Sequence, residues 1–534
     1  MRIVNISIQA ENADSLREAA SELKDSGIDV DIFDADYRDL EKSPELFEDL
    51  VRHIGLADMV VIRCMAEPTR FSRYSRLEPV LEQCRSPVFL FSGAAEMRPL
   101  YRDVFDGTDR DYGLLCQYLM YKGKDNEKGL ILWLNERLGG PAIPVPAPVI
   151  PRQDGIYHPD CDPDISLDEY VRRLDPSRPT AGIVMTQTDW MSGNTEHIDA
   201  FIRGLEEKGM NTIPIFYSHL APPEDGEKGL PIFIKKYFMH DGRPRIDVLL
   251  LTISSSNLVH SKKGEGTGFD VEVSRNFYKT IADVPVIQAL CVHNKWEDFE
   301  EDKAGLDKHD ITILVIRPEL DGQIMGVPIG CIGKDGGKKL MPLAPGIDHV
   351  SRMALNWATL RRKKPEERKI AIIMYQPRDD SSCIGSSGGL DVQESVCGML
   401  RTMSEAGYRV EHVPHNGDEL VQELLKGVTN DLNWISPKEA FEKAAGVQGP
   451  KEYGRTFRSV PRFNQERLVR SWGEPPGEVT VLEGNMIMPG VENGNILITY
   501  QPIRALGEQT DALYHDPVIP APHQYLGFYR WLKT

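Results

Sequence analysis

The sequence predicts several tandem α/β units, each with a parallel sheet of the Rossmann-like or flavodoxin-like type. Its 534 residues correspond to about three domains, at roughly 100 to 200 residues per domain. Short apolar runs rich in Val and Ile alternate with amphipathic segments, which is typical of βαβ units, and this alternation starts again twice. We therefore expect an N-terminal α/β domain at 1–145, a Pro-rich linker at 146–178, a second α/β domain at 179–345 and a third α/β unit at 346–534.

In the first domain, strands are expected to alternate with helices. The strands are predicted at 3–8, 30–33, 59–62 and 88–91, and the helices at 13–23 and 44–53. Prolines at 141, 144, 146, 148 and 151 then interrupt the pattern. Because proline lacks a backbone donor and favours extended chain, this composition predicts a linker.

The second domain is expected to repeat the arrangement. Its predicted elements are strands at 182–185, 212–217 and 248–253, a helix at 195–208, and short buried strands at 284–292 and 311–316. A basic helix at 348–364 is expected to lead out of this domain.

The third unit is predicted to begin with a strand, a Gly-rich loop and a helix, at 369–375, 376–389 and from 391 onward. Asp391 and Glu394 have the spacing of a capping box. Polar helices are expected over 416–475, strands at 479–481 and 496–500, and an aromatic helix at 524–532. So much aromatic surface in a last helix needs a neighbour, so we expect this chain to be part of a longer one.

Composition and charge exclude several classes of protein. Apolar residues make up 41% and charged residues 27% of the chain, as in ordinary globular proteins. With 62 basic and 81 acidic residues, the net charge is −19, which opposes binding to nucleic acid or an anionic membrane. The N-terminus has the pattern of a strand, and no apolar run approaches the roughly 18 residues of a membrane span. We expect a cytoplasmic protein whose eight scattered cysteines are reduced.

The loop Gly385, Ser386, Ser387, Gly388 and Gly389 precedes a predicted helix. Its backbone N–H groups could hold a carboxylate or phosphate, or the glycines could simply allow a tight turn. No G-x-x-x-x-G-K-[ST] sequence is present, so any linked ATP hydrolysis is expected on another polypeptide. The segment 264–268 misses the dinucleotide spacing and is interpreted as a plain loop.

Histidines offer further candidates for chemistry. His412 and His415 could share a metal if the chain turns between them, but ordinary polar surface is the favoured interpretation. Cys291 and His293 alternate along a predicted strand, where core packing is favoured for the cysteine. His523 lies near the first turn of the aromatic helix, downstream of His515. It could transfer a proton or transiently ligate a metal, or it could make a hydrogen bond at the helix entry.

These last segments carry a family resemblance. Residues 495–507, 511–515, 520–523 and 525–532 resemble the large subunit of ATP-dependent cobaltochelatase (CobN type), which is related to the H subunit of magnesium chelatase. The resemblance continues upstream at 375–377, 385–391 and 348–368, is weaker over 180–343, and is loose in the first 150 residues. The family usually has paired histidines where this chain has His523-Gln524, and it continues into a histidine-glycine-lysine motif. The chain therefore resembles only the N-terminal part of such a subunit.

The resemblance implies a protein that binds a tetrapyrrole and takes part in inserting Co²⁺ or Mg²⁺, while partner subunits of the AAA+ class hydrolyse ATP. It suggests His523 as a base, and metal ligands that are not identifiable here. The implied substrate-binding residues are Gly385, Ser386, Ser387, Gly388, Gly389, Gln501, Tyr525, Phe528 and Trp531.

Cobalt insertion into a corrin precursor of cobalamin biosynthesis is the favoured interpretation. A porphyrin-binding protein like the large component of magnesium chelatase and a non-catalytic α/β scaffold of the same ancestry remain the alternatives. The isolated chain, without the rest of the subunit, is expected to be inactive.

Overall fold

Helices and short strands alternate along the whole computed structural model, and parallel pairs occur in all three strand-rich regions. The expected α/β class is confirmed. The structure describes residues 1–534 except 9–13, 65–66, 94–97, 103–104, 219–228, 254–277, 280, 296–304, 307–309, 334–338, 377–380, 382–383, 386–387, 433–434 and 505–517. It forms two compact units, residues 1–359 and 360–534. No helix among the described residues is long and apolar enough to cross a membrane.

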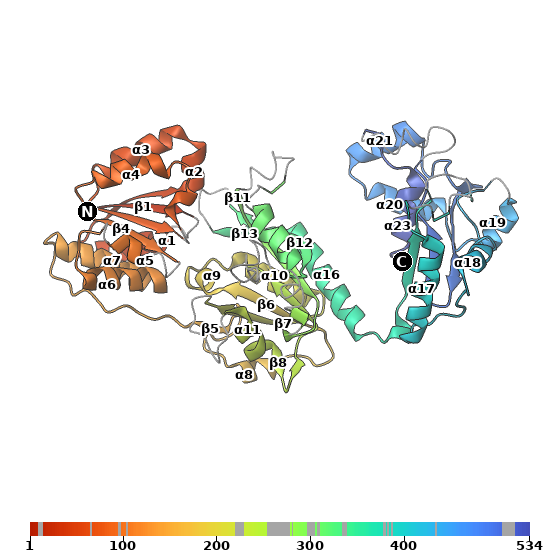
Figure 1. Ribbon diagram of the computed structural model, residues 1–534, viewed down its shortest axis with the longest axis horizontal. Coiled ribbons are helices and arrows are strands. Elements are labelled where there is room, and N and C mark those ends of the chain that lie inside the picture. The colour runs from red at the N-terminus through yellow and green to blue at the C-terminus, as the bar shows by residue number, and fades with distance from the viewer. Residues whose placement is uncertain are drawn as a thin grey trace. The chain divides into compact units, whose positions relative to one another are not determined.

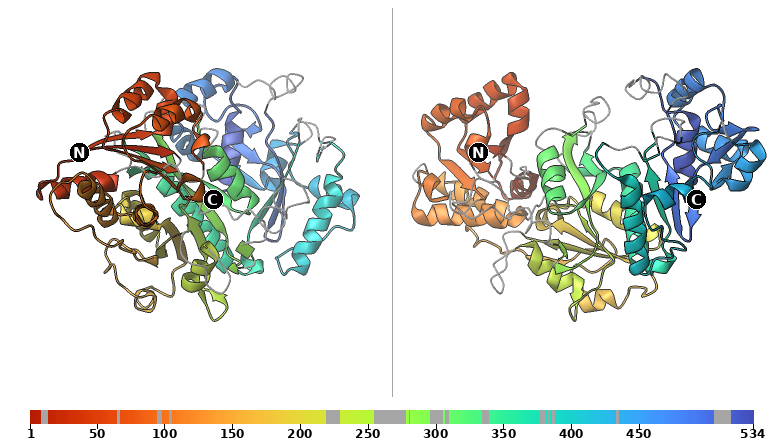
Figure 2. Two further views of the ribbon diagram at one scale, coloured as in Figure 1. Left: turned by 60° about the vertical axis from the view of Figure 1, so that its left-hand side comes forward. Right: turned by 45° about the vertical axis from the view of Figure 1, so that its right-hand side comes forward.

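The first region has a four-stranded, fully parallel sheet in the order β2-β1-β3-β4. Its strands are β1 (Arg2–Ile8), β2 (Asp31–Asp36), β3 (Met59–Cys64) and β4 (Val88–Ser92). Figures 1 and 2 show helices on both faces, and each face has its own apolar core. One face carries α2 (Tyr37–Lys42), α3 (Pro44–Ile54) and α4 (Tyr74–Glu82), and the other carries α1 (Asp14–Lys24), α6 (Asp109–Tyr121) and α7 (Lys124–Arg137).

A buried ion pair joins this sheet to α7. The guanidinium of Arg63 on β3 donates to both carboxylate oxygens of Glu127, at 2.5 and 3.0 Å. Its Nε also donates to Asn5 Oδ1 on β1, at 2.7 Å. Arg63 is 9% exposed and Glu127 1% exposed, so neither charge has water to replace its partner.

The second region has a seven-stranded sheet in the order β13-β12-β11-β10-β6-β7-β5. Its five central strands are parallel and its two edge strands antiparallel. Helices α10 (Glu196–Glu207) and α16 (Ala344–Arg362) share one apolar core against it. The strands are β5 (Asp154–Ile156), β6 (Thr180–Thr186), β7 (Asn211–Tyr217), β10 (Val248–Leu251), β11 (Val286–Lys295), β12 (Ile324–Ile332) and β13 (Leu340–Pro342).

Two expectations for this region differ from the structure. The predicted strand at 311–316 is a π-helix, η4 (Ile311–Ile316), with Ile311 and Ile316 both exposed. An apolar run of six residues does not by itself distinguish a strand from a helix. The predicted linker at 146–178 holds strand β5, which pairs with β7, and helix α8 (Leu167–Val171).

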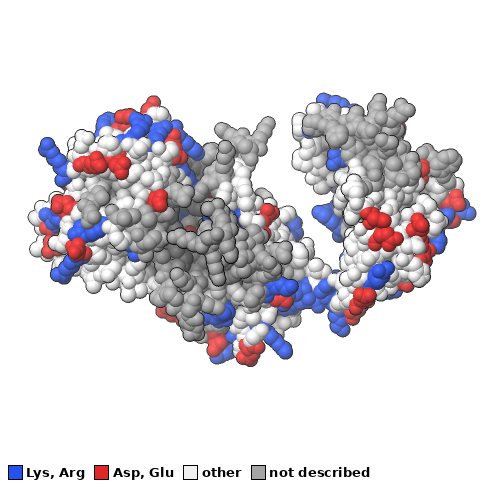
Figure 3. Space-filling model, in the orientation of Figure 1, with Lys and Arg blue, Asp and Glu red and all other residues white. Residues whose placement is uncertain are grey.

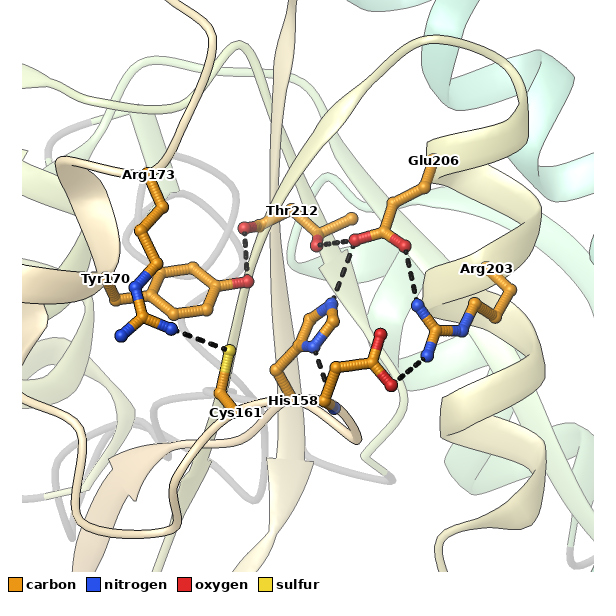
Figure 4. A network of polar contacts seen from close by, with 8 residues as sticks. His158, Cys161, Tyr170, Arg173, Arg203, Glu206 and Thr212 are labelled. Atoms are coloured by element: carbon orange, nitrogen blue, oxygen red, sulfur yellow. Dashed lines mark hydrogen bonds and ion pairs between the residues drawn. The ribbon is translucent and has the colours of Figure 1, made fainter.

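Polar contacts explain why this segment belongs to the second region. Figure 4 shows His158, which belongs to this segment, and Glu206, which lies on α10, pointing toward each other. His158 Nε2 lies 2.9 Å from Glu206 Oε1. Arg203, one turn away on α10, contacts both Glu206 and Asp160. The hydroxyl of Tyr170 on α8 donates to the Thr212 carbonyl on β7 at 3.0 Å. These contacts tie the segment to both α10 and β7.

The second unit contains two small sheets. Strands β14 (Ile370–Met374) and β19 (Ile496–Tyr500) are parallel, and β18 (Val491–Asn493) adds to β19 antiparallel. Strands β15 (Gly446–Gln448), β17 (Asn485–Met488) and β16 (Val481–Leu482) form an antiparallel sheet. The helices include α17 (Val392–Glu405), α18 (Gly417–Leu424), α19 (Pro437–Lys443), α20 (Pro450–Arg458), α21 (Arg462–Trp472) and α23 (His523–Trp531).

The same helix ending occurs in all three regions. In each region, a glycine with positive φ follows the first long helix after the first parallel strand. These helices are α1, α10 and α17 in the first region, the second region and the second unit. The residue after the glycine donates its N–H to a carbonyl five residues earlier, as in a Schellman motif. The three bonds join Ile28 to Leu23, Met210 to Leu205 and Tyr408 to Met403.

Charged side chains are mixed on the surface. On the face drawn in Figure 3, Lys and Arg lie interspersed with Asp and Glu over the described residues of the first region. The net charge of −19 is therefore not gathered into one patch there.

Candidate functional site

The carboxyl ends of β14 and β19 form the candidate site in the second unit. The strands are parallel and in register, with Met374 opposite Tyr500. The residues that follow them therefore emerge at the same edge of the sheet, where α/β proteins usually bind ligands. Gln376 follows β14 and Gln501 follows β19.

A third polar residue joins the two loops. Asn430 Nδ2 donates to Gln376 Oε1 at 3.1 Å and to the Gln501 carbonyl at 2.9 Å. The Gln501 N–H donates to the Met374 carbonyl at 2.8 Å. Gln376 is 0% and Asn430 3% exposed. Asn430 therefore links the buried side chain of Gln376 to the backbone of Gln501.

Gln501, which we expected to bind substrate, reaches helix α23. Its Nε2 donates to the Tyr525 hydroxyl. The Arg504 guanidinium carbon lies 5.5 Å from the Tyr525 ring centroid, within the range of a cation–π contact. The ring centroids of Tyr525 and Tyr529 are 5.2 Å apart. Burial raises the pKa of the Tyr529 hydroxyl, while the nearby Arg504 charge lowers it.

The aromatic face of α23 differs in part from our expectation. Tyr525 is half-buried, and Tyr529, one turn later, is 37% exposed. Phe528 is 1% exposed and packs with Tyr453, Met486 and Met488, while Trp531 packs against the same cluster. Phe528 therefore stabilises the unit. Trp531 is half-buried, as Tyr525 is, and the accessible pair beside Gln501 is Tyr525 and Tyr529.

Different glycines of the Gly-rich loop fit the two interpretations, a tight turn and a ligand contact. Gly385 is buried with φ +70°, and its N–H donates to the Tyr375 carbonyl at 2.9 Å, so this glycine makes a tight turn. Gly388 and Gly389 are exposed, and a Cβ at either position would meet nothing within 4 Å. They remain candidates for ligand contact. Ser386 and Ser387 lie outside the described residues.

The N-terminus of α17 is capped by a carboxylate. Asp391 accepts the Glu394 N–H at 3.0 Å, as expected. Glu394 does not complete a capping box, because its Oε1 accepts the Gly417 N–H at 2.6 Å. The Asp391 charge already occupies the positive end of the helix dipole. A bound anion would therefore depend on the glycine N–H groups more than on this helix end.

His523 lies at the start of α23 with both ring nitrogens engaged. Nε2 lies 2.9 Å from the Gly473 carbonyl, and Nδ1 lies 2.7 Å from the Tyr453 hydroxyl. A carbonyl can only accept, so Nε2 carries the proton and Nδ1 accepts from the tyrosine. The side chain is 1% exposed, and burial lowers the pKa of His523.

This geometry does not fit the role of base that we expected for His523. Its one lone pair already accepts a hydrogen bond from inside the protein, and the ring is hidden from solvent. The other interpretation, a hydrogen bond at the helix entry, describes the contacts. His523 therefore positions α23, which carries Tyr525 and Tyr529.

The other histidine and cysteine candidates form no metal site in the part of the chain that the structure describes, where no group of three potential ligands occurs. His412 Nε2 lies 3.2 Å from Glu419 Oε1, and the His415 N–H donates to Glu419 Oε2. Cys291 is buried, which raises its pKa. The side chain of His293, all of His515 and segment 264–268 lie outside the described residues.

The sequence analysis missed Asn430, Arg504, Gln376 and Tyr529. Asn430 is separated from Gln376 by 54 residues and from Gln501 by 71, so no local pattern could pair them. Tyr529 follows Tyr525 at the i,i+4 spacing of one helical face, a signal that the sequence does contain.

Comparison with known proteins agrees with this description. Residues 116–534 match the model of the family described as CobN/Magnesium Chelatase. The chain belongs to this family. It is 31% identical to an uncharacterized protein of Methanocaldococcus jannaschii, over 97% of this chain and 42% of that protein. It is 28% identical to the aerobic cobaltochelatase subunit CobN of Pseudomonas aeruginosa, over 71% of this chain and 29% of that subunit.

Relatives that differ in metal also match. Identity to the H subunit of the magnesium chelatase of Rhodobacter capsulatus is 26%, over 79% of this chain and 35% of that relative. The solved catalytic subunit of cobaltochelatase from Mycobacterium tuberculosis shares the fold, with a TM-score of 0.60 and 24% identity, over 100% of this chain and 41% of that chain. This family member thus spans less than half the length of these relatives.

Proposed function

We propose that this chain is a tetrapyrrole-binding part of the large subunit of an ATP-dependent metal chelatase. Family membership supports this proposal. The observation that carries it is the accessible pair Tyr525 and Tyr529 beside Gln501 and Arg504 at the carboxyl edge of β14 and β19. A tetrapyrrole is a broad apolar plate with polar arms, so its site needs aromatic walls and a few polar groups.

The proposed roles follow from this arrangement. The rings of Tyr525 and Tyr529 contact the plate, while Gln501 holds Tyr525 in place through its hydroxyl. The exposed backbone of Gly388 and Gly389 contacts an arm. His523 positions α23 through its hydrogen bonds with the Tyr453 hydroxyl and the Gly473 carbonyl. The base that removes the two inner-ring protons is then a group other than His523.

The metal is a substrate in this proposal, and Co²⁺ insertion into a corrin precursor of cobalamin biosynthesis is the preferred reaction. Residues 511–515 and 525–532 resemble the cobalt branch of the family more than the magnesium branch. Identity to the relative named for cobalt is 28%, against 26% to the relative named for magnesium, so porphyrin binding of the magnesium chelatase kind is the second candidate. ATP is hydrolysed by partner subunits of the AAA+ class, because this sequence has no Walker A lysine loop.

Titration of the purified chain with a metal-free porphyrin or corrin precursor tests the proposal. Tyr525→Leu and Tyr529→Leu should each weaken binding roughly 3- to 10-fold, because an aromatic contact contributes about 0.5–1.5 kcal/mol beyond burial. Tyr408→Leu is the matched control, since Tyr408 lies in the same unit and contacts Arg368 instead. Equal affinity in all four proteins would contradict the proposed site.

A further inference from the structure

We infer that helices α20 and α21 form a docking surface for an acidic polypeptide, a segment of a partner protein in which Asp and Glu are mixed with apolar residues. This inference goes beyond tetrapyrrole binding and does not depend on it. It is carried by a local excess of positive charge and by exposed apolar side chains that lie beside it.

The charge of this helix pair is opposite to that of the chain. Between residues 450 and 472 the sequence has six basic and two acidic residues, whereas the whole chain has 62 basic and 81 acidic residues. One of the two acids, Glu466, already pairs with Arg462 at 3.1 Å. The other exposed cations make no ion pair with any residue that the structure describes; they are Lys451, Arg455, Arg458 and Arg470. The pair of helices is therefore a positive patch on an acidic protein, and charge complementarity favours an acidic partner there.

Three of these cations lie along one side of α20. Lys451, Arg455 and Arg458 are spaced by four and three residues, so their side chains share one face of the helix. Tyr453, on the other side, is 0% exposed and bonds to His523. The fold thus uses one side of α20 for packing and leaves the charged side to solvent.

Apolar surface is exposed beside the charges on α21. The Arg467 guanidinium carbon lies 5.6 Å from the Phe463 ring centroid, and Arg467 also donates to the Val518 carbonyl. Phe463 and Val518 are each 69% exposed, the largest fractions of any large apolar residue in the described part of the chain. The turn before α21 is held by Gln465, whose Nε2 donates to the Val460 carbonyl at 2.6 Å. An exposed aromatic ring beside arginines is typical of protein–protein interfaces.

An acidic protein segment fits this surface better than a nucleic acid does. Carboxylates can form two parallel bonds to a guanidinium, and an apolar side chain of the same segment can cover Phe463. A short segment brings its few charges to the patch alone. A nucleic acid would extend its dense negative charge past the patch, along a chain whose net charge is −19.

Fluorescence anisotropy with the full 534-residue chain tests this inference. The probe is the labelled peptide Glu-Glu-Leu-Glu-Glu-Leu-Glu-Glu, and the comparison peptide has Gln in place of every Glu. The chain should bind the acidic peptide about tenfold more tightly than the Gln peptide, and added salt should weaken this preference. Joint replacement of Lys451, Arg455 and Arg458 by Gln should lower affinity for the acidic peptide roughly tenfold, because each exposed ion pair contributes modestly. Phe463→Ser should lower it roughly fivefold by removing apolar contact area.

The matched control removes three exposed cations elsewhere in the same unit, with Arg401→Gln, Lys426→Gln and Lys438→Gln combined. It changes the net charge equally and should keep the wild-type affinity, and circular dichroism checks that each variant is folded. Equal affinity of the two triple variants would overturn the inference, as would equal binding of the acidic and Gln peptides by the wild-type chain. Tighter binding of single-stranded oligo(dT) than of the acidic peptide would also overturn it, and would assign this surface to nucleic acid.

Discussion

Replacing Tyr453 by Phe removes one hydroxyl and tests whether His523 is a positioning residue. The hydroxyl donates to His523 Nδ1 at 2.7 Å, and the two residues are 0% and 1% exposed. Losing the donor leaves a buried acceptor unsatisfied, which costs about 1–3 kcal/mol. At about 2–4 °C per kcal/mol for a unit of this size, the melting temperature of residues 360–534 should fall by about 2–12 °C.

A double-mutant cycle isolates the bond. His523→Ala should cost about as much as or more than Tyr453→Phe, because it loses both hydrogen bonds and leaves a cavity. The double variant should cost less than the sum by about 1–2 kcal/mol, since the shared bond can be lost only once. Hydrogen exchange of peptides from α20 and α23, read by mass spectrometry, measures the loss of local stability. It separates this loss from unfolding of the first unit.

The same histidine predicts a dependence on pH. Burial lowers the pKa of His523 in the folded state, so below the unfolded pKa of about 6.5 the unfolded chain binds a proton that the folded chain does not. Its contribution to stability is therefore complete above about pH 6.5 and is lost as the pH falls toward the folded pKa. The free energy of unfolding of His523→Ala should therefore decrease less than that of the wild-type chain as the pH falls over this range.

Two outcomes would refute this reasoning. Additive effects of Tyr453→Phe and His523→Ala would show that the pair is not coupled. A fully reconstituted chelatase in which His523→Ala abolishes metal insertion, while local stability and tetrapyrrole binding are unchanged, would return His523 to the role of base.

Three further predictions concern other parts of the chain. Glu127→Leu should destabilise the first region by about 3–5 kcal/mol, because the buried Arg63 charge would lose the carboxylate that neutralises it; urea unfolding measures this loss of stability, and the double variant with Arg63→Met should recover much of it. Asp391→Ala should cost about 1 kcal/mol by removing the N-cap of α17, visible as faster hydrogen exchange in its first turn, whereas Asp391→Ser should not. The purified chain should release no phosphate from ATP and insert no metal; phosphate release would contradict the assignment of ATP hydrolysis to partner subunits, and metal insertion would contradict the expected inactivity of the isolated chain.

Local patterns were sufficient to predict the class of fold and most of the parallel strands, although β12 was missed. The runs at 370–374 and 496–500 are apolar, short and bounded by polar residues, and both are strands. The run at 311–316 has the same apolar character but is a π-helix. Such a run shows only that the segment is apolar, and the surrounding structure decides its backbone conformation.

The site was harder to predict because helical phase and distant contacts decide it. Helix α23 has aromatic residues on several sides, so aromatic identity alone could not separate buried Phe528 from accessible Tyr529. His523 was correctly located at the helix entry, but the Tyr453 hydroxyl that occupies its lone pair comes from 70 residues earlier. The bonds that link the two loops of the site likewise depend on Asn430, which no motif marks.

The Schellman bonds that end α1, α10 and α17 make Gly27, Gly209 and Gly407 the sensitive positions of these helix ends. A Cβ at any of the three would meet no backbone or buried side chain closer than 3.9 Å, so space does not forbid a larger residue. The positive φ does, because the left-handed conformation costs a residue with a Cβ roughly 1–2 kcal/mol.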